Sequence, residues 1–368
     1  MKILLIEPYF GGSHRAWAEG YAQHSAHHVD LVVLPARFWK WRMQGGAVTL
    51  AAHVRALDFR ADLVLASDML NVPAFLGLAR DVLGSIPLVL YCHENQLTYP
   101  WPPGEKRDLT YAVINWLSMV AADRVVFNWQ FHLEDWFSEL PQLLRHFPDC
   151  SHLGEIADVR RKSTVLPVGC DLRRFDAVTR QPQAAAEPPL VLWNQRWEYD
   201  KDPETFLRAL QAVAAAGVDF RVALAGANQS DAAPEFDIAR EWLGDRVIHT
   251  GYASASDYIQ LLRRADVVVS TAIHEFFGVA VVEAIYSGCF PVLPDRLAYP
   301  GMVAAGHREM CLFDSFGALV ERLGWALTHA EERNQIAQEL RPYVARFDWS
   351  HVAGEYDGRL AEWVGGLD

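Results

Sequence analysis

The chain has 368 residues, of which 51% are hydrophobic, and this length exceeds what one ordinary core supports. Two domains of a soluble globular protein are therefore expected. The net charge of −13 argues against a polyanionic partner for the molecule as a whole, and no apolar run reaches the roughly 18 residues of a membrane span.

The charge is unevenly distributed along the chain. Residues 1–175 carry a net charge of −1, whereas residues 176–368 carry −12. An anionic macromolecule should therefore approach the first half. The five cysteines are scattered and contain no C-x-x-C pair, which indicates reduced thiols in a cytoplasmic protein and argues against a zinc site.

The first half alternates strand and helix patterns. Its first apolar run is interrupted by Glu7 and Pro8, so we interpret it as a strand and not as a signal peptide. In doubly wound folds, a glycine-rich turn between a strand and a helix lets the backbone approach a phosphate, and Gly11 and Gly12 occupy such a position. A Gly-Gly pair is more often only a turn. Strands are expected at 2–7, 29–34, 61–67, 87–92, 124–128 and from 164, and helical segments at 15–25 and 110–121.

A hexapeptide after the second strand alternates cations with aromatic rings. This composition stacks bases and contacts phosphates in single-stranded nucleic acid. The alternative is an amphipathic element whose rings lie in the core and whose cations lie in water. The six residues are Arg37, Phe38, Trp39, Lys40, Trp41 and Arg42.

The strand at 87–92 leads directly into His93. Ligands of parallel sheets bind at the carboxyl ends of strands, so His93 lies where catalysis is expected. A neutral imidazole there could donate or accept a hydrogen bond near a reacting sugar. The alternative is a histidine that only caps the strand.

The second half repeats the alternation after a polar segment that contains three prolines. This organisation predicts two Rossmann-like domains, 1–176 and 190–346, joined by a linker at 177–189 and followed by a final helical segment at 347–368. Further strands are expected at 190–194, 220–225, 247–250, 265–270 and 290–293, and a helix at 204–216.

Two segments of the second half carry candidate ligand-binding residues. Arg196 and Lys201 flank one loop at a strand end and could neutralise a diphosphate, unless nearby acids pair with them in solvent. Glu275 lies at a strand-to-helix junction, and a helix from Val279 would place Glu283 on a similar face, deeper in the protein. The amides of Phe277, Gly278 and Val279 would be free donors at the helix start. Two ordinary surface acids are the alternative, but Glu283 lies in an apolar run.

These motifs together resemble a known family. The Glu275-to-Glu283 element, the 167–171 turn with Phe175, and the Arg196/Lys201 loop resemble retaining GT-B glycosyltransferases of the family-four type. The segments around His93, 197–203 and 274–300, with the opening 7–14, resemble the tRNA-queuosine α-mannosyltransferase group within it over nearly the full chain. The resemblance implies two Rossmann-like domains that face each other across a cleft, with a last helix crossing back to the first domain.

The resemblance also implies roles for individual residues. Arg196 and Lys201 would hold the donor diphosphate, Glu283 the ribose hydroxyls, and Glu275 the transferred sugar, with His93 beside it. Gly11 and Gly12 would allow close approach to the diphosphate. His274, Phe277, Gly278 and Val279 would complete the donor site, and Arg37, Trp39, Lys40, Trp41, Arg42, His14 and Asn95 would receive the acceptor.

The implied activity is transfer of mannose from GDP-mannose to the queuosine base in the anticodon of tRNA, of the tRNA-Asp type, without a metal or other cofactor. Attack would occur on the front face, with the leaving phosphate helping to take the acceptor proton. Two alternatives stay open. The same enzyme class could act on a small-molecule, glycan or lipid acceptor, or the chain could be a non-catalytic protein that binds sugar nucleotides or RNA.

Overall fold

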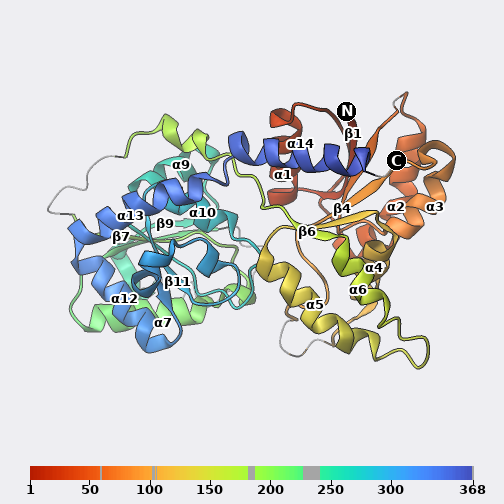
Figure 1. Ribbon diagram of the computed structural model, residues 1–368. Coiled ribbons are helices and arrows are strands. Elements are labelled where there is room, and N and C mark those ends of the chain that lie inside the picture. The colour runs from red at the N-terminus through yellow and green to blue at the C-terminus, as the bar shows by residue number, and fades with distance from the viewer. Residues whose placement is uncertain (59, 102–103, 105, 181–186, 227–240, 367–368) are drawn as a thin grey trace. The chain divides into compact units, whose positions relative to one another are not determined.

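The computed structural model describes residues 1–58, 60–101, 104, 106–180, 187–226 and 241–366. Contacts divide the chain into one unit of Met1–Cys170 with Trp349–Asp368 and a second unit of Asp171–Asp348. Each unit contains a parallel sheet with helices, which confirms the predicted α/β class (Figure 1). Among these residues, no helix is both long and apolar enough to cross a membrane.

The sheet of the first unit has the strand order β2-β1-β3-β4-β5-β6, and every pairing is parallel. All residues of β3 and β4 are buried, which explains why both strands read as uninterrupted apolar runs. The first strand continues beyond its predicted end, because Phe10 still pairs with Pro35. The strands are β1 (Lys2–Phe10), β2 (His28–Pro35), β3 (Leu63–Ser67), β4 (Leu88–Cys92), β5 (Arg124–Phe127) and β6 (Ser163–Val165).

The helices of the first unit connect these strands. The chain leaves β1 toward β2 but leaves β3 toward β4, so the connections run in opposite directions from the two neighbouring strands. Such a reversal is the switch point at which ligands bind in doubly wound sheets, and here it lies between β1 and β3. The helices are α1 (Gly12–His24), α2 (Trp39–Arg55), α3 (Val72–Leu83), α4 (Thr110–Ala121), α5 (Gln130–Leu144), α6 (Glu155–Arg161) and α14 (Trp349–Gly365).

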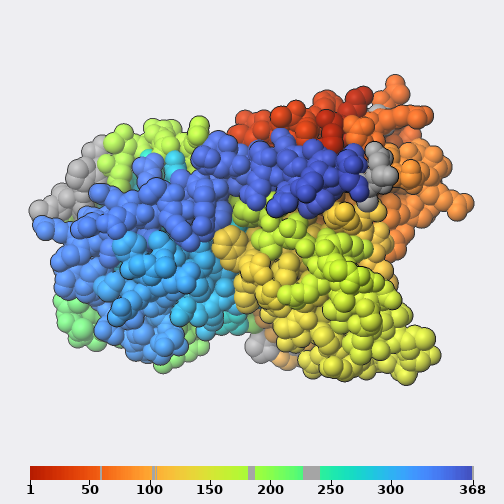
Figure 2. Space-filling model, in the orientation of Figure 1, coloured from red at the N-terminus to blue at the C-terminus, as the bar shows by residue number. Residues whose placement is uncertain are grey.

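The last helix, α14, packs on the first unit beside α1, as the blue and red segments show in Figures 1 and 2. Its first residue, Trp349, is buried against two glycines. A Cβ atom at Gly20 would lie 2.1 Å from the indole Nε1 of Trp349, and one at Gly169 would lie 2.4 Å from its Cδ2. Side chains at both positions are therefore excluded by the docking of α14.

The sheet of the second unit has the order β12-β11-β10-β7-β8-β9 and is also parallel throughout. Connections leave β7 in one direction and β10 in the other, so the switch point lies between these two strands. The strands are β7 (Leu190–Trp193), β8 (Arg221–Ala225), β9 (Val247–Gly251), β10 (Val267–Val269), β11 (Phe290–Pro294) and β12 (Leu312–Phe313). The helices are α7 (Pro203–Ala215), α9 (Ala255–Arg264), α10 (Val279–Tyr286), α11 (Arg308–Cys311), α12 (Phe316–Thr328) and α13 (Ala330–Ala345).

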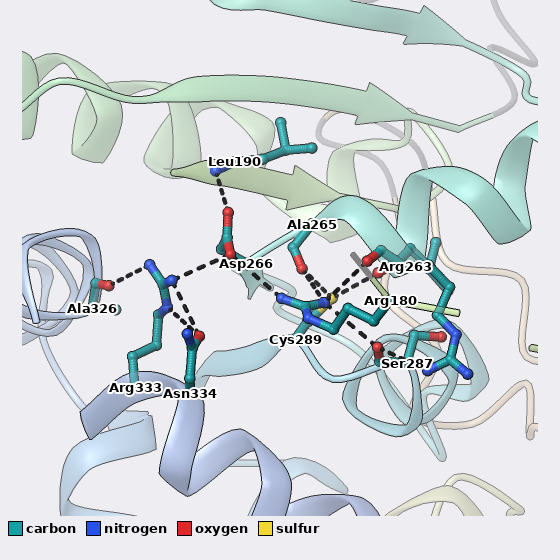
Figure 3. A network of polar contacts seen from close by, with 11 residues as sticks. Arg180, Leu190, Arg263, Ala265, Asp266, Ser287, Cys289, Ala326, Arg333 and Asn334 are labelled. Atoms are coloured by element: carbon teal, nitrogen blue, oxygen red, sulfur yellow. Dashed lines mark hydrogen bonds and ion pairs between the residues drawn. The ribbon is translucent and has the colours of Figure 1, made fainter. Parts of the chain in front are cut away.

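A buried charge network lies at the amino ends of β7 and β10 (Figure 3). Asp266 accepts a 2.9 Å hydrogen bond from the Leu190 amide and contacts Arg333 at 3.2 Å and Arg180 at 3.4 Å. Arg333 also donates to the Ala326 carbonyl on α12. The network therefore joins the sheet to α12, α13 and Arg180 in the predicted linker at 177–189, of which residues 181–186 lie outside the described part.

Candidate active site

The first cluster of predicted site residues lies at the switch point of the second unit. Lys201 lies after β7 and Glu275 lies after β10. These two strands are neighbours in the sheet, so the two side chains lie close together. The Lys201 Nζ lies 3.1 Å from Asp200 Oδ2 and 3.4 Å from Glu275 Oε2, and it donates a 3.0 Å hydrogen bond to the His274 carbonyl. Lys201 is buried, whereas about a quarter of the Glu275 side chain is exposed. The cluster thus presents an acid at the surface over a buried cation.

The pKa values of these groups follow from their proximity. Burial lowers the pKa of Lys201, but Glu275 and Asp200 outweigh it and raise the pKa above its ordinary value. Burial and the Lys201 charge lower the pKa of His274 to about 4. Burial opposes ionisation of Glu275, yet Lys201 and His274 hold its pKa below the ordinary value. At neutral pH the cluster therefore holds a lysine cation, a glutamate anion and a neutral histidine.

The start of α10 differs in one respect from the prediction. Gly278 has φ 94°, a left-handed conformation that favours glycine, and the helix begins at Val279 as expected. The amide of Phe277 is not a free donor, because it contacts Glu275 Oε1 at 3.3 Å. Glu275 satisfies this amide itself, as a carboxylate near a helix start commonly does. The predicted amide cradle is thus reduced to Gly278 and Val279.

Arg196 lies in a different environment from Lys201. Its side chain is about half exposed and its Nη1 lies 3.3 Å from Glu198 Oε1. The pairing of these loop cations with neighbouring acids, which the sequence left open, is therefore present for both. The two cations still differ, because only Lys201 is buried and held by three oxygen atoms.

Glu283 lies in a second network of the same unit. Its Oε1 accepts a 2.6 Å bond from Arg174 and its Oε2 a 3.0 Å bond from the Tyr258 hydroxyl. Asn194, the residue after β7, donates to Tyr258 at 3.1 Å. Burial raises the pKa of Glu283, and the contacts with Arg174 and Tyr258 oppose that rise. Both carboxylate oxygens are occupied, and Arg174 is the more exposed partner, with about 40% of its side chain in solvent.

His93 lies at the carboxyl end of β4 in the first unit. Its amide donates a 2.8 Å bond to Asp68 Oδ1, and its carbonyl accepts one from Asn128. The rings of Trp17, Tyr91 and His14 surround the imidazole with centroid distances of 4.6, 4.8 and 4.3 Å. Burial, with the neighbouring His14, places the pKa of His93 well below its ordinary value. The imidazole is therefore neutral and fixed in orientation.

His14 lies in the first turn of α1 and forms an ion pair with Glu7. Its Nδ1 is 3.0 Å from Glu7 Oε2, while Glu7 Oε1 accepts a 2.8 Å bond from the Tyr9 amide. Burial alone would lower the pKa of His14, but Glu7 outweighs burial and raises it to about 9. His14 is therefore charged at neutral pH, in contrast to His93.

The glycine pair and Asn95 have local structural roles in the first unit. Gly11 precedes α1 and packs against Ala36, where a Cβ atom would lie 2.5 Å from the Ala36 Cβ. Gly12 has φ 52° with open space where a Cβ would stand. Asn95 accepts bonds from the Leu97 and Thr98 amides, so its oxygen is used to form the turn after β4.

The predicted acceptor hexapeptide lies at the start of α2. Phe38 has 78% and Trp41 has 61% of their surface exposed, so the alternative with all rings in the core is wrong for these two residues. Lys40 Nζ lies over the rings of Trp39 and Trp101, at 5.5 and 5.6 Å. The Trp41 indole lies against Gly45, where a Cβ would come within 2.7 Å of the ring, so a larger residue at position 45 would displace the ring.

The other two cations of the hexapeptide, Arg37 and Arg42, differ in exposure. Arg37 is exposed, whereas Arg42 is half-buried and its Nε donates a 3.2 Å bond to the Pro35 carbonyl. Trp39 packs against Tyr111 with a ring distance of 4.9 Å. The hexapeptide therefore divides into an exposed part and a part that anchors the helix start.

One group of side chains in the described part could hold a metal ion by spacing alone. The donor atoms of Glu7, His14 and His93 lie within 4.8 Å of one another. In this structure Glu7 and His14 contact each other directly, which is the geometry of a hydrogen-bonded ion pair. We therefore assign Glu7 and His14 to an ion pair beside the neutral His93, and the independence from metal stays a prediction.

Sequence reasoning missed several residues that complete these clusters. Asp200, Arg174 and Tyr258 contact predicted donor residues, and Glu7 and Asp68 contact predicted residues of the first unit. The one available signal was an acid at the carboxyl end of an apolar strand, which Glu7 and Asp68 share. Arg174 and Tyr258 carried no such signal, because their partner is far away in the sequence.

Comparison with known families divides the chain in two. Residues 2–170 match the family described as tRNA-queuosine alpha-mannosyltransferase N-terminal, and residues 175–341 match the family described as glycosyl transferases group 1. The two matches meet near the boundary at which contacts divide the chain.

Individual relatives agree with this division. A tRNA-queuosine alpha-mannosyltransferase of Drosophila melanogaster is 32% identical over 330 residues, which cover 87% of this chain and 85% of the relative. A GDP-mannose:cellobiosyl-diphosphopolyprenol alpha-mannosyltransferase of Xanthomonas oryzae pv. oryzae is 28% identical over 199 residues, covering 52% of this chain and 50% of the relative.

A solved structure supports the fold. Sucrose-phosphate synthase of Thermosynechococcus elongatus aligns over 100% of both chains with a TM-score of 0.71 and 16% identity. At this level of identity the likeness concerns the fold, which is that of the GT-B glycosyltransferases.

Proposed function

Because the chain belongs to the tRNA-queuosine α-mannosyltransferase family and is a glycosyltransferase, we propose that it transfers mannose from GDP-mannose to the queuosine base in the anticodon of a tRNA. The observation that carries the proposal is the match of residues 2–170 to the N-terminal domain of that family. The group 1 domain is shared by glycosyltransferases with other acceptors, so the first half is the part that distinguishes this acceptor.

The donor is proposed to bind in the second unit around Lys201. Lys201 and Arg196 would neutralise the diphosphate, and the buried position of Lys201 makes its charge effective because water screens it little. Glu275 is proposed to orient the hydroxyl groups of the sugar, since its partly exposed carboxylate is kept ionised by Lys201. His274, Phe277, Gly278 and Val279 would line the same site.

Glu283 is proposed to accept hydrogen bonds from the ribose hydroxyl groups. Both of its oxygen atoms are already bonded, to Arg174 and Tyr258. A ribose diol could replace the guanidinium, because both supply donors to a carboxylate and Arg174 is the exposed partner. Nucleotide binding would then release Arg174 from Glu283.

The choice of GDP-mannose as donor is supported by relatives. The Xanthomonas relative and a Mycobacterium tuberculosis relative that is 29% identical over 197 residues are both named for GDP-mannose. We propose that transfer retains the configuration of the sugar by front-face attack, in which the leaving phosphate accepts the acceptor proton. No protein nucleophile is then required, and neutral His93 would contribute a hydrogen bond to the sugar.

The acceptor is proposed to bind on the first unit. The exposed rings of Phe38 and Trp41 would stack on bases of the anticodon loop, and Arg37 and Lys40 would contact phosphates. Trp41 packs on Gly45 and keeps most of its surface exposed, and an aromatic side chain loses little conformational freedom on stacking. Asn95 and His14 would lie at the same carboxyl edge of the sheet as His93.

The test is a reaction of purified protein with GDP-mannose and queuosine-containing tRNA, followed by mass analysis of the nucleosides. We expect a queuosine product heavier by one hexose residue. The control is the same tRNA carrying guanine in place of queuosine, and UDP-glucose serves as the control donor. Product from a small-molecule, glycan or lipid acceptor in place of tRNA, or no product from folded protein that binds nucleotide, would contradict the proposal.

A further inference from the structure

A buried ion pair lies at the switch point of the first unit, between the carboxyl ends of β1 and β3. Glu7 is fully buried, and both of its oxygens are bonded, one to the Tyr9 amide and one to His14. Its contact with His14 is 3.0 Å long. A carboxylate held in this way stays beside His14 and does not turn toward solvent.

The pair is oriented with its positive end toward the surface. Glu7 has no exposed surface, whereas about a tenth of the His14 side chain reaches solvent. A ligand that reaches this pair from solvent would contact the imidazole, because Glu7 itself has no exposed surface. An anion there would gain a charge-assisted hydrogen bond, while the counter-charge stays more distant.

His93 completes the arrangement. Its ring lies 4.3 Å from that of His14, and its Nε2 is buried without a hydrogen-bond partner among the described residues. Buried ring nitrogens normally have a partner, so an orphaned one beside a charged imidazole points to a ligand atom or water. The two histidines thus offer a cation and a neutral hydrogen-bonding group side by side.

Other charged groups around His14 come from three strands. Besides Glu7 on β1, Asp68 follows β3 and Glu94 follows β4, and all three raise the pKa of His14 against the effect of burial. Burial raises the pKa of Asp68 to about 8. Tyr9 lies edge-on to His14 at 6.1 Å, and His93 is uncharged at neutral pH.

We propose that Glu7 is a positioning residue that keeps His14 protonated beside His93, and that the His14 imidazolium binds a phosphate group of a substrate. The inference rests on the proposed function, which supplies two sources of phosphate, the sugar nucleotide and the tRNA backbone. Glu7 does not touch the substrate. It acts by setting the charge of His14, so its replacement changes binding through that charge.

The first measurement is an NMR titration of the histidine side chains in the whole protein without ligand, with the His14 signal assigned from a His14→Gln variant. We expect His14 to titrate near pH 9 in the unmodified protein. In Glu7→Gln the titration should move down by about three units or more, to about pH 6 or below, because burial then acts without the neighbouring carboxylate. Glu19→Gln, on the exposed face of α1, is the matched control and should leave it unchanged.

The second measurement is the affinity for GDP-mannose and, separately, for tRNA at pH 7 and pH 10. Loss of the imidazolium should weaken one of the two ligands about tenfold or more, both at pH 10 in the unmodified protein and at pH 7 in Glu7→Gln. The ligand that is affected identifies the source of the phosphate. The pH arm compares the unmodified protein with His14→Gln, because the bases of both ligands and other side chains also titrate near pH 10. Only the loss of affinity that is absent in His14→Gln reports the imidazolium, and misfolding of Glu7→Gln would not remove this test.

Three results would overturn the inference. The first is a His14 titration near pH 6.5 in the unmodified protein. The second is an affinity for both ligands that does not change with the charge of His14. The third is stoichiometric zinc bound by the purified protein and lost in Glu7→Gln, since the three side chains would then hold a metal. The titration does not depend on mannosyl transfer, so failure of the proposed activity would be seen separately.

Discussion

Glu275 and Glu283 have pKa shifts of opposite direction, although they lie in one short segment and each contacts a cation. Glu275 is beside the Lys201 ammonium, which holds its pKa low, while burial raises the pKa of Glu283. Glu275 retains an exposed edge, whereas the oxygens of Glu283 are covered by Arg174 and Tyr258. Glu275 is therefore suited to the hydroxyl groups of the reacting sugar, and Glu283 to the two hydroxyl groups of the ribose, which does not react.

The first prediction compares alanine variants of these two acids. Glu283→Ala should weaken binding of GDP by about tenfold to a hundredfold, because two hydrogen bonds to a charged group are lost. Glu275→Ala should lower kcat by a similar factor and change donor affinity little. Calorimetric titration of GDP and steady-state kinetics measure the two effects, with the exposed Glu321→Ala as control. Equal loss of donor affinity with unchanged turnover in both variants would refute the division of roles.

At the scale of the elements, buried charges hold the second unit together. Asp266, the residue before β10, accepts a hydrogen bond from the amide of Leu190 at the start of β7. It also pairs with Arg333 of α13, which is almost fully buried. Such a network is costly to break from one side, because the remaining charge stays buried without compensation. Its position at the amino ends of the strands, away from the donor cluster, assigns it to stability.

We therefore predict that Asp266→Asn lowers the free energy of unfolding by about 3 kcal/mol. The asparagine still accepts the Leu190 amide bond, so the loss reports the charge. Urea denaturation measures the change, with Asp219→Asn, whose side chain is mostly exposed, as the control expected within about 0.5 kcal/mol of the unmodified protein. A change below about 1 kcal/mol in Asp266→Asn would show that Arg333 finds another partner.

At the scale of the whole molecule, the uneven charge bears on where RNA binds. The first 175 residues are nearly neutral and carry the exposed rings and cations of α2, whereas the remainder carries −12. A tRNA is repelled by the acidic part at long range, and this repulsion orients its approach. Loss of a cation from the surface at the start of α2 should therefore weaken tRNA binding more than loss of a cation elsewhere.

The corresponding prediction concerns the salt dependence of tRNA binding. Replacing both Arg37 and Lys40 with alanine should weaken binding at low salt and reduce the slope of log affinity against log salt concentration by about 1 to 2. Arg264→Ala, an exposed cation of the second unit, is the matched control and should leave the slope unchanged. Unchanged binding and slope in the double variant would move the RNA surface elsewhere. Filter binding at several salt concentrations gives both quantities.

The sequence alone determined the alternation of strands and helices and the two α/β halves. It could do so because strands buried on both faces read as apolar runs and because ligand-binding residues follow strand ends. His93 directly follows β4, and Lys201 and Glu275 lie in the segments that follow β7 and β10. The donor and the acceptor were predicted from the family resemblance, because neither composition nor periodicity specifies them.

The tertiary structure decided which charges meet. Glu283 contacts Arg174, more than a hundred positions earlier, and Asp68 contacts the amide of His93, the residue after the neighbouring strand β4. These contacts depend on the order of the strands and on the switch points, which a local pattern does not contain. The same is true of the charge of His14, because burial would remove its proton and only the neighbouring acids retain it.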